Sequence, residues 1–175
     1  MVLIIKNHNL KLKRRIAVFL EQIFASSSDE FLVELVLDRL LWTATEDNDN
    51  NKRVKYLGQP YWSKLAILQY QKQNQGLKNK NFKDLRHEHI VPRNLIKQFI
   101  LDLPSKTADD ILNILSKYSH AVIVTKAEDQ RLKALGLNTN MPKSFYESDN
   151  IQSRYQTAEI DIINVEGKDL KQLVI

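Results

Sequence analysis

The sequence contains no cysteine and no long apolar run. Without cysteine, the chain can form neither disulfide bonds nor a zinc site built from thiolates. No stretch approaches the roughly 18 apolar residues that a membrane-spanning helix requires. The N-terminal segment MVLIIKNHNLKLKRR has a short apolar run followed by basic residues, which is not the order of a secretory signal. We therefore expect a cytoplasmic protein without a membrane partner.

The composition is that of a folded globular protein. Hydrophobic residues make up 43% of the chain and charged residues 27%, which excludes an intrinsically disordered class. A chain of 175 residues is long enough for one sizeable core and short for two independent domains. We see no internal repeat and no low-complexity tract. The sequence therefore predicts one compact domain with three regions: 1–83 (N-terminal and helical), 84–140, and a C-terminal extension, 141–175.

Apolar residues recur mainly at steps of three and four positions, which is the spacing of helices. This pattern predicts helices over 11–24, 27–46, 60–73, 94–103, 107–118 and 125–136. Runs rich in Val and Ile predict strands near 87–92 and 120–125, with a weaker one within 155–167. Ser27 with Glu30 and Thr125 with Glu128 have capping-box spacing, and Gly136 suits the end of a helix. The fold class expected is α+β and mostly helical.

Positive charge is concentrated in the middle of the chain. The net charge is +5, but residues 51–106 alone hold 12 lysine and arginine residues against 3 acidic ones, a balance of +9. The segments on either side are each at −2. A basic field favours a polyanionic partner, because Lys and Arg that neutralise phosphates release bound counterions. A solvated lysine-rich surface without a partner would give the same count.

One short motif lies inside this basic segment and a second lies after it. The first is EHIVP (88–92), in the strand predicted near 87–92, and the second is VIVTKAEDQRL (122–132), a predicted strand that leads into a helix. Together they resemble the HNH, or ββα-metal, nuclease superfamily; no subfamily is identified. The resemblance covers about 50 residues. It implies a small ββα-metal-like core with a helical insertion between the two strands (strand near 87–92, strand near 120–125, helix 126–136).

The resemblance also implies roles for individual residues. His89 would be the general base, since a neutral imidazole accepts a proton near pH 7. Glu88 and Asp129 would be the metal ligands, with Asp129 at a position where many members have histidine. Carboxylate oxygens suit Mg²⁺ or Mn²⁺, which keep several waters and use few protein ligands. The activity implied is metal-dependent hydrolysis of DNA phosphodiesters, with RNA less favoured, in restriction, phage defence or a mobile element.

Further residues are candidates for the same site. His87, His120, Asn94 and Glu128 could add to it, although the spacing from Thr125 makes Glu128 a helix cap first and a ligand second. Guanidinium groups grip phosphates with paired donors. The candidates for phosphate or nucleic-acid binding are Arg86, Arg93 and Arg131, and more loosely Arg154 with Tyr155. A homodimer would suit cleavage of both strands.

Two other functions stay open on the sequence. A regular strand directs His87 and His89 to one face and Glu88 to the other, which suits a pair of histidine ligands better than a Glu–His pair. A histidine-based metal-dependent RNase or hydrolase, with His120 as the third histidine, would bind zinc or nickel rather than Mg²⁺. Alternatively, the protein is a non-catalytic nucleic-acid-binding protein with a degenerate HNH fold.

Overall fold

The computed structural model describes residues 9–27, 29–46, 55–75 and 81–175. The chain is a mostly helical α+β protein, as predicted. None of the helices in these ranges has the length and apolar character needed to cross a membrane.

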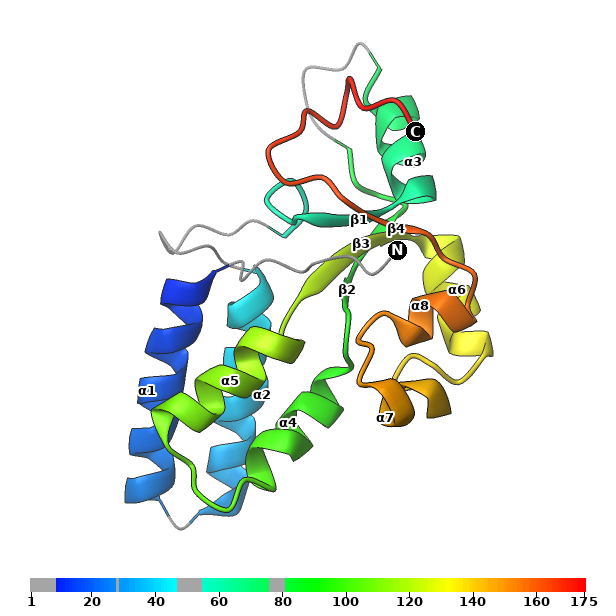
Figure 1. Ribbon diagram of the computed structural model, residues 1–175. Coiled ribbons are helices and arrows are strands. Elements are labelled where there is room, and N and C mark those ends of the chain that lie inside the picture. Colours follow the sequence, from blue (N-terminus) through cyan, green and yellow to red (C-terminus); the bar gives the residue numbers. More distant parts are fainter. Residues whose placement is uncertain (1–8, 28, 47–54, 76–80) are drawn as a thin grey trace. The chain divides into compact units, whose positions relative to one another are not determined.

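The described chain groups into two compact units (Figure 1). Unit 1 holds the described residues of 56–88 and 121–175, and unit 2 holds those of 9–55 and 89–120. The boundary falls inside one strand, between Glu88 and His89. This grouping differs from the predicted regions 1–83, 84–140 and 141–175, since unit 1 combines residues from all three. The single compact domain stays a prediction.

Unit 2 is a set of four helices. They are α1 (Leu10–Ser26), α2 (Glu30–Glu46), α4 (Arg93–Leu101) and α5 (Ala108–Tyr118). Helix α1 packs on α5 and on α2, and α4 packs on both α2 and α5, so each helix has two neighbours within the unit. Most of their buried side chains are aliphatic and recur at helical spacing, for example Leu12, Ile16 and Leu20 on α1 and Val33, Leu37 and Leu41 on α2.

Unit 1 is built on a four-stranded sheet with the order β2-β3-β1-β4. The strands are β1 (Tyr61–Ser63), β2 (Leu85–His89), β3 (Ala121–Thr125) and β4 (Ile162–Asn164). Strand β1 runs parallel to β3 and antiparallel to β4. Backbone bonds at 2.8 Å from Lys126 to Asp84 and from Ile90 to His120 flank β2 and β3, and this pairing is antiparallel because the residue numbers add to the same value.

Four helices accompany the sheet: α3 (Lys64–Gln73), α6 (Lys126–Ala134), α7 (Lys143–Ser148) and α8 (Ser153–Thr157). Helix α6 begins at the residue that follows β3, so β2, β3 and α6 follow one another as strand, strand and helix, with α4 and α5 inserted. One core cluster of the unit is centred on Trp62, which packs with Ile67, Tyr70, Leu85 and Ile123. The apolar side chains of β1, α3, β2 and β3 thus position the strand–strand–helix segment.

The predicted helix 60–73 is wrong at its start. Residues 61–63 form β1, and α3 begins at Lys64 with Ser63 as its N-cap, whose side chain accepts a hydrogen bond from the Ala66 amide. Pairing of Tyr61 with Asn164 and of Trp62 with Ile123 outweighs the local helical spacing. The strand within 155–167 is confirmed only at Ile162–Asn164, after α8.

Of the two predicted capping boxes, one is confirmed and one is wrong. The capping box of Thr125 and Glu128 is confirmed, and Gly136 ends α6 with a φ of 69°. The capping box predicted for Ser27 is wrong, because Asp29 accepts the hydrogen bond from the Leu32 amide at 3.1 Å. Aspartate is as good an N-cap as serine, so the start of the helix decides between these two candidates, which lie two positions apart.

Candidate active site

The HEH stretch lies at the end of β2, where burial alternates along the strand. His87 and His89 are each 6% exposed, whereas Arg86 and Glu88 are partly exposed. This is the alternation that an extended strand imposes. Glu88 belongs to unit 1 and His89 to unit 2, so each half of the candidate site is described within its own unit.

In unit 1 the two predicted metal ligands carry coupled charges. Glu88 lies on β2, and Asp129 lies in the first turn of α6, where it is almost fully buried. Burial raises the pKa of Glu88, and the negative charge of Asp129 raises it further; the Arg154 guanidinium opposes the rise without cancelling it. The negative charge of Asp129 thus disfavours the ionised form of Glu88.

Each carboxylate is balanced by one cation. The Glu88 side chain accepts a hydrogen bond from Arg154 Nη2 at 3.3 Å, and Asp129 accepts one from Lys133 Nζ at 2.8 Å. The Lys133 side chain is largely exposed and the Asp129 side chain is buried, so solvent reaches only the lysine side of this ion pair. Paired carboxylates are hard oxygen donors, and they fit a cation such as Mg²⁺ or Mn²⁺. Within the described ranges, no group of three or more His, Asp or Glu side chains is placed to hold a metal ion.

Arg154 is the residue of this cluster whose role the sequence did not indicate. Its side chain is 1% exposed, and it donates to the Leu137 carbonyl at 2.9 Å and to the Tyr155 hydroxyl at 2.7 Å as well as to Glu88. Burial alone would lower the pKa of Arg154, but attraction to Tyr155 and Glu88 and hydrogen bonds to both outweigh burial and raise it. Burial, opposed by Arg154, raises the pKa of Tyr155 to about 12.

The buried setting of Arg154 distinguishes it from a phosphate-binding arginine on the surface. No local signal marks it, because Glu88 lies 66 positions earlier in the chain and the flanking segment has no motif. Its only visible feature in the sequence is its place beside Tyr155, which suggested phosphate contact rather than a carboxylate partner.

Glu128 acts as a structural cap. Its Oε2 accepts hydrogen bonds from the Thr125 amide at 2.8 Å, the Thr125 hydroxyl at 2.9 Å and the Ser63 hydroxyl at 2.6 Å. These bonds join the start of α6 to the end of β1. The same capping box places Asp129 one residue further into α6.

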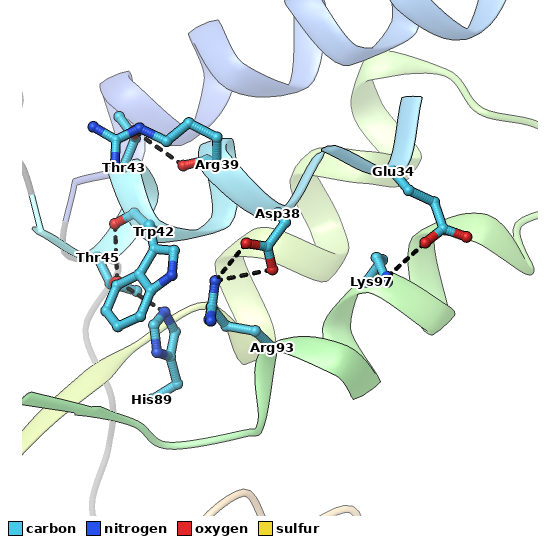
Figure 2. A network of polar contacts seen from close by, with 9 residues as sticks. All are labelled: Glu34, Asp38, Arg39, Trp42, Thr43, Thr45, His89, Arg93 and Lys97. Atoms are coloured by element: carbon cyan, nitrogen blue, oxygen red, sulfur yellow. Dashed lines mark hydrogen bonds and ion pairs between the residues drawn. The ribbon is translucent and has the colours of Figure 1, made fainter. Parts of the chain in front are cut away.

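In unit 2, His89 is held by the C-terminal turns of α2 (Figure 2). Its Nε2 lies 3.0 Å from the Thr45 hydroxyl oxygen, and its ring meets the Trp42 ring edge-on, with centroids 4.8 Å apart. The Arg93 guanidinium lies over the Trp42 ring, 4.1 Å from its centroid. It donates hydrogen bonds to both carboxylate oxygens of Asp38 at 2.9 Å. Arg93 is thus held by two residues of α2.

The remaining candidates are dispersed. His120 Nε2 lies 2.8 Å from the Ser116 carbonyl oxygen in unit 2, and Asn94 is an exposed residue in the first turn of α4. Arg86 donates to the carbonyls of Lys83 and Leu85, and Arg131 donates to the carbonyl of Ala158. His87 belongs to unit 1, whereas His89 and His120 belong to unit 2.

Comparisons of this chain with protein-family models, with curated proteins and with solved structures found no match.

Proposed function

We propose that the protein is a metal-dependent, HNH-like endonuclease that hydrolyses DNA phosphodiester bonds. One observation carries the proposal. An antiparallel strand pair leads directly into α6, and the two carboxylates expected to bind metal, Glu88 and Asp129, come from the first strand and from the first turn of that helix. Burial raises the pKa of Glu88, and the negative charge of Asp129 adds to this rise.

The chain's own groups supply the rest of the chemistry. Glu88 and Asp129 would hold Mg²⁺ or Mn²⁺, and a bound cation of this kind stabilises the negative charge that grows on the leaving oxygen. His89 follows Glu88 directly, so their Cα atoms are separated by about 3.8 Å, the span of one peptide unit. As general base, His89 takes a proton from the attacking water.

The basic segment 51–106 would supply DNA contacts, with Arg86 and Arg93 as candidate phosphate ligands, and Arg131 on α6 is a third candidate. A cytoplasmic nuclease of restriction, phage defence or a mobile element fits this activity, and a homodimer would cut both strands. Arg93 has the strongest competing partner, Asp38, so phosphate binding at this residue requires exchange of a carboxylate for a phosphate.

The decisive experiment is cleavage of supercoiled plasmid DNA in Mg²⁺ or Mn²⁺. We expect nicking or linearisation by the wild type, and its loss in His89→Ala and in EDTA. His120→Ala is the matched control, because His120 is also a buried histidine of unit 2, with its Nε2 2.8 Å from the Ser116 carbonyl oxygen of α5. Equal cleavage by wild type and His89→Ala would contradict the proposal.

A second function, DNA binding without cleavage, is favoured by the burial of His89 and by the pairing of each carboxylate with a cation. It predicts a DNA mobility shift that is lost at high salt but survives both EDTA and His89→Ala. Cleavage that requires His89 and metal would exclude it.

A further inference from the structure

Three aromatic rings of unit 1, those of Tyr56, Phe82 and Tyr70, form a ring column. The Tyr56 and Phe82 rings are parallel to within 5°, with centroids 4.6 Å apart, and Phe82 stacks on Tyr70 at 5.8 Å and 16°. Tyr70 is 2% exposed and meets the buried Trp62 edge-on, whereas Tyr56 and Phe82 are only partly buried. Among the rings of the described residues Tyr56 contacts Phe82 alone, so it is the outer end of the column.

Hydrogen bonds hold the backbone of the two outer rings in place. The side chain of the buried Asn74 accepts from the Asn81 amide at 2.6 Å and donates to the Asn81 carbonyl at 3.0 Å, which fixes the residue before Phe82. The Tyr56 carbonyl accepts from the Gln59 amide at 3.0 Å. A ring that is already held in position loses little conformational entropy when a ligand stacks on it.

The chain beside both outer rings is strongly basic. Directly before Tyr56, the sequence holds three Lys or Arg residues in 52–55. Around Phe82 it holds four in 78–86 against one acidic residue, and Lys83, the neighbour of Phe82, is exposed. Proteins that bind single-stranded nucleic acid combine aromatic rings, on which bases stack, with cations that neutralise the phosphates. The outer end of the ring column has both features.

We propose that Tyr56 is a stacking platform for an unpaired base, and that the protein binds single-stranded DNA at the outer end of the ring column. Bases inside a duplex already stack on both neighbours, so only an unpaired base offers a free face to the ring. The proposal deepens the DNA contact of the proposed function and rests on it for the choice of DNA as the polymer. It does not rest on cleavage, because stacking uses neither a metal ion nor a general base.

Photocrosslinking of the wild-type protein tests the contact without any variant. The probe is a single-stranded oligonucleotide of about 10 nucleotides, within the site sizes of single-strand-binding domains, that carries 5-iodouracil in place of thymine. On irradiation this base couples to an aromatic ring stacked on it, and mass spectrometry identifies the modified residue. The experiment is made in EDTA, so cleavage does not contribute. We expect Tyr56 to be the crosslinked residue and an unlabelled duplex of the same sequence to compete weakly.

Two variants of Tyr56 measure how much the ring contributes to affinity. Tyr56→Leu removes the ring, so we expect the Kd for the single-stranded oligonucleotide in EDTA to rise about 5- to 100-fold, the scale of one stacked base. Tyr56→Phe keeps the ring and should bind as the wild type does. Tyr146→Leu is the matched control, because Tyr146 is a 63% exposed tyrosine of unit 1 that lies outside the ring column, edge-on to Phe145. It should leave the Kd unchanged.

The outcomes separate this proposal from the nuclease function. A wild-type protein that gives no crosslink at Tyr56 would overturn the stacking platform, even if Tyr56→Leu failed to fold. The same Kd for the wild type and a folded Tyr56→Leu would overturn it as well. If the crosslink forms and the loss of the ring weakens binding, but no form of the protein cuts plasmid DNA, the platform is supported and only the nuclease function fails.

Discussion

At the scale of single residues, Arg154 joins Glu88 to other parts of unit 1. It is fully buried and donates to a carboxylate, a hydroxyl and a backbone carbonyl in unit 1. Removing one partner of a buried ion pair leaves the other charge uncompensated, which costs more than the intact pair contributes.

We expect Arg154→Met to lower the free energy of unfolding of unit 1 by about 3 kcal/mol, because Glu88, Tyr155 and the Leu137 carbonyl all lose a donor. Urea denaturation measures this loss. Arg131→Met is the matched control, since Arg131 is exposed and donates to one carbonyl, of Ala158; it should cost less than about 1 kcal/mol. Equal losses in the two variants would show that Arg154 does not balance Glu88.

Glu88 makes the stability of unit 1 depend on pH. Its pKa is raised above 4.5 in the folded protein, first by burial and then by Asp129, so the folded state binds its proton more tightly than the unfolded state does. The stability that this provides is complete below pH 4.5 and is lost as pH rises through the folded pKa. Glu88→Gln cannot ionise and keeps an acceptor for Arg154.

The unfolding free energy of Glu88→Gln relative to the wild type should therefore increase as pH rises from 4.5 and level off above the folded pKa. Urea denaturation of both proteins across this range, in EDTA to exclude metal, gives the difference. A difference that stays constant with pH would mean that burial does not raise the pKa of Glu88.

At the scale of elements, short-range signals located one capping box and misplaced another. Thr125 with Glu128 could be located because four consecutive residues contain the whole motif, whereas the same spacing of Ser27 and Glu30 was misleading because Asp29 caps α2. Strand β1 could not be located, because its three residues are extended only through pairing with β3 and β4, about 60 and 100 positions away.

The ends of α6 and α8 share one motif with different residues. Gly136 and Glu159 both have positive φ, 69° and 53°. Both helices end in a Schellman motif, in which the Leu137 amide donates to the Leu132 carbonyl and the Ile160 amide to the Tyr155 carbonyl, each at 2.8 Å. Glycine adopts this conformation without strain, whereas a residue with a Cβ pays about 1–2 kcal/mol. Sequence alone marked only the end that carries glycine.

Glu159→Gly should therefore stabilise the protein by about 0.5–1 kcal/mol, since relief of strain exceeds the added entropy of the unfolded chain. Thermal unfolding would show a midpoint raised by roughly 1–4 °C, on a scale of about 2–4 °C per kcal/mol for a chain of this size. Gly136→Ala is the reverse control. A Cβ at Gly136 would meet no atom within 4 Å, so its expected loss of about 1 kcal/mol arises from φ alone. A destabilised Glu159→Gly would contradict the assignment of strain.

At the scale of the whole molecule, the candidate site draws on residues far apart in the chain. The resemblance predicts His89, Glu88 and Asp129 as site residues, because they lie in two short motifs, and their roles stay predictions. It could not locate Thr45, which is 44 positions before His89, or Arg154, since neither contact is encoded by local spacing. Long-range partners are set by packing of whole elements, which one sequence does not reveal.

The division into two units makes metal binding testable by position. The chain has two tryptophans, and each unit holds one: Trp62 in unit 1 and Trp42 in unit 2. Trp42→Phe therefore leaves a fluorescence probe of unit 1, and Trp62→Phe leaves a probe of unit 2. Glu88 and Asp129 both belong to unit 1, so a metal ion bound by them stabilises that unit directly.

We expect Mn²⁺ at about 100 times its dissociation constant to stabilise unit 1 by about 2.7 kcal/mol, because the ion binds the folded state alone. The midpoint reported by Trp62 should rise by roughly 5–10 °C, on a scale of about 2–4 °C per kcal/mol, while that reported by Trp42 should stay unchanged. Asp129→Asn should abolish the rise, as should EDTA.

Lys133→Ala is the control in the other direction, since it removes the cation that competes for Asp129 and should lower the Mn²⁺ concentration required. A rise reported equally by both tryptophans would mean that the two units unfold together or that the ion binds elsewhere, and a rise that survives Asp129→Asn would remove this carboxylate from the metal site.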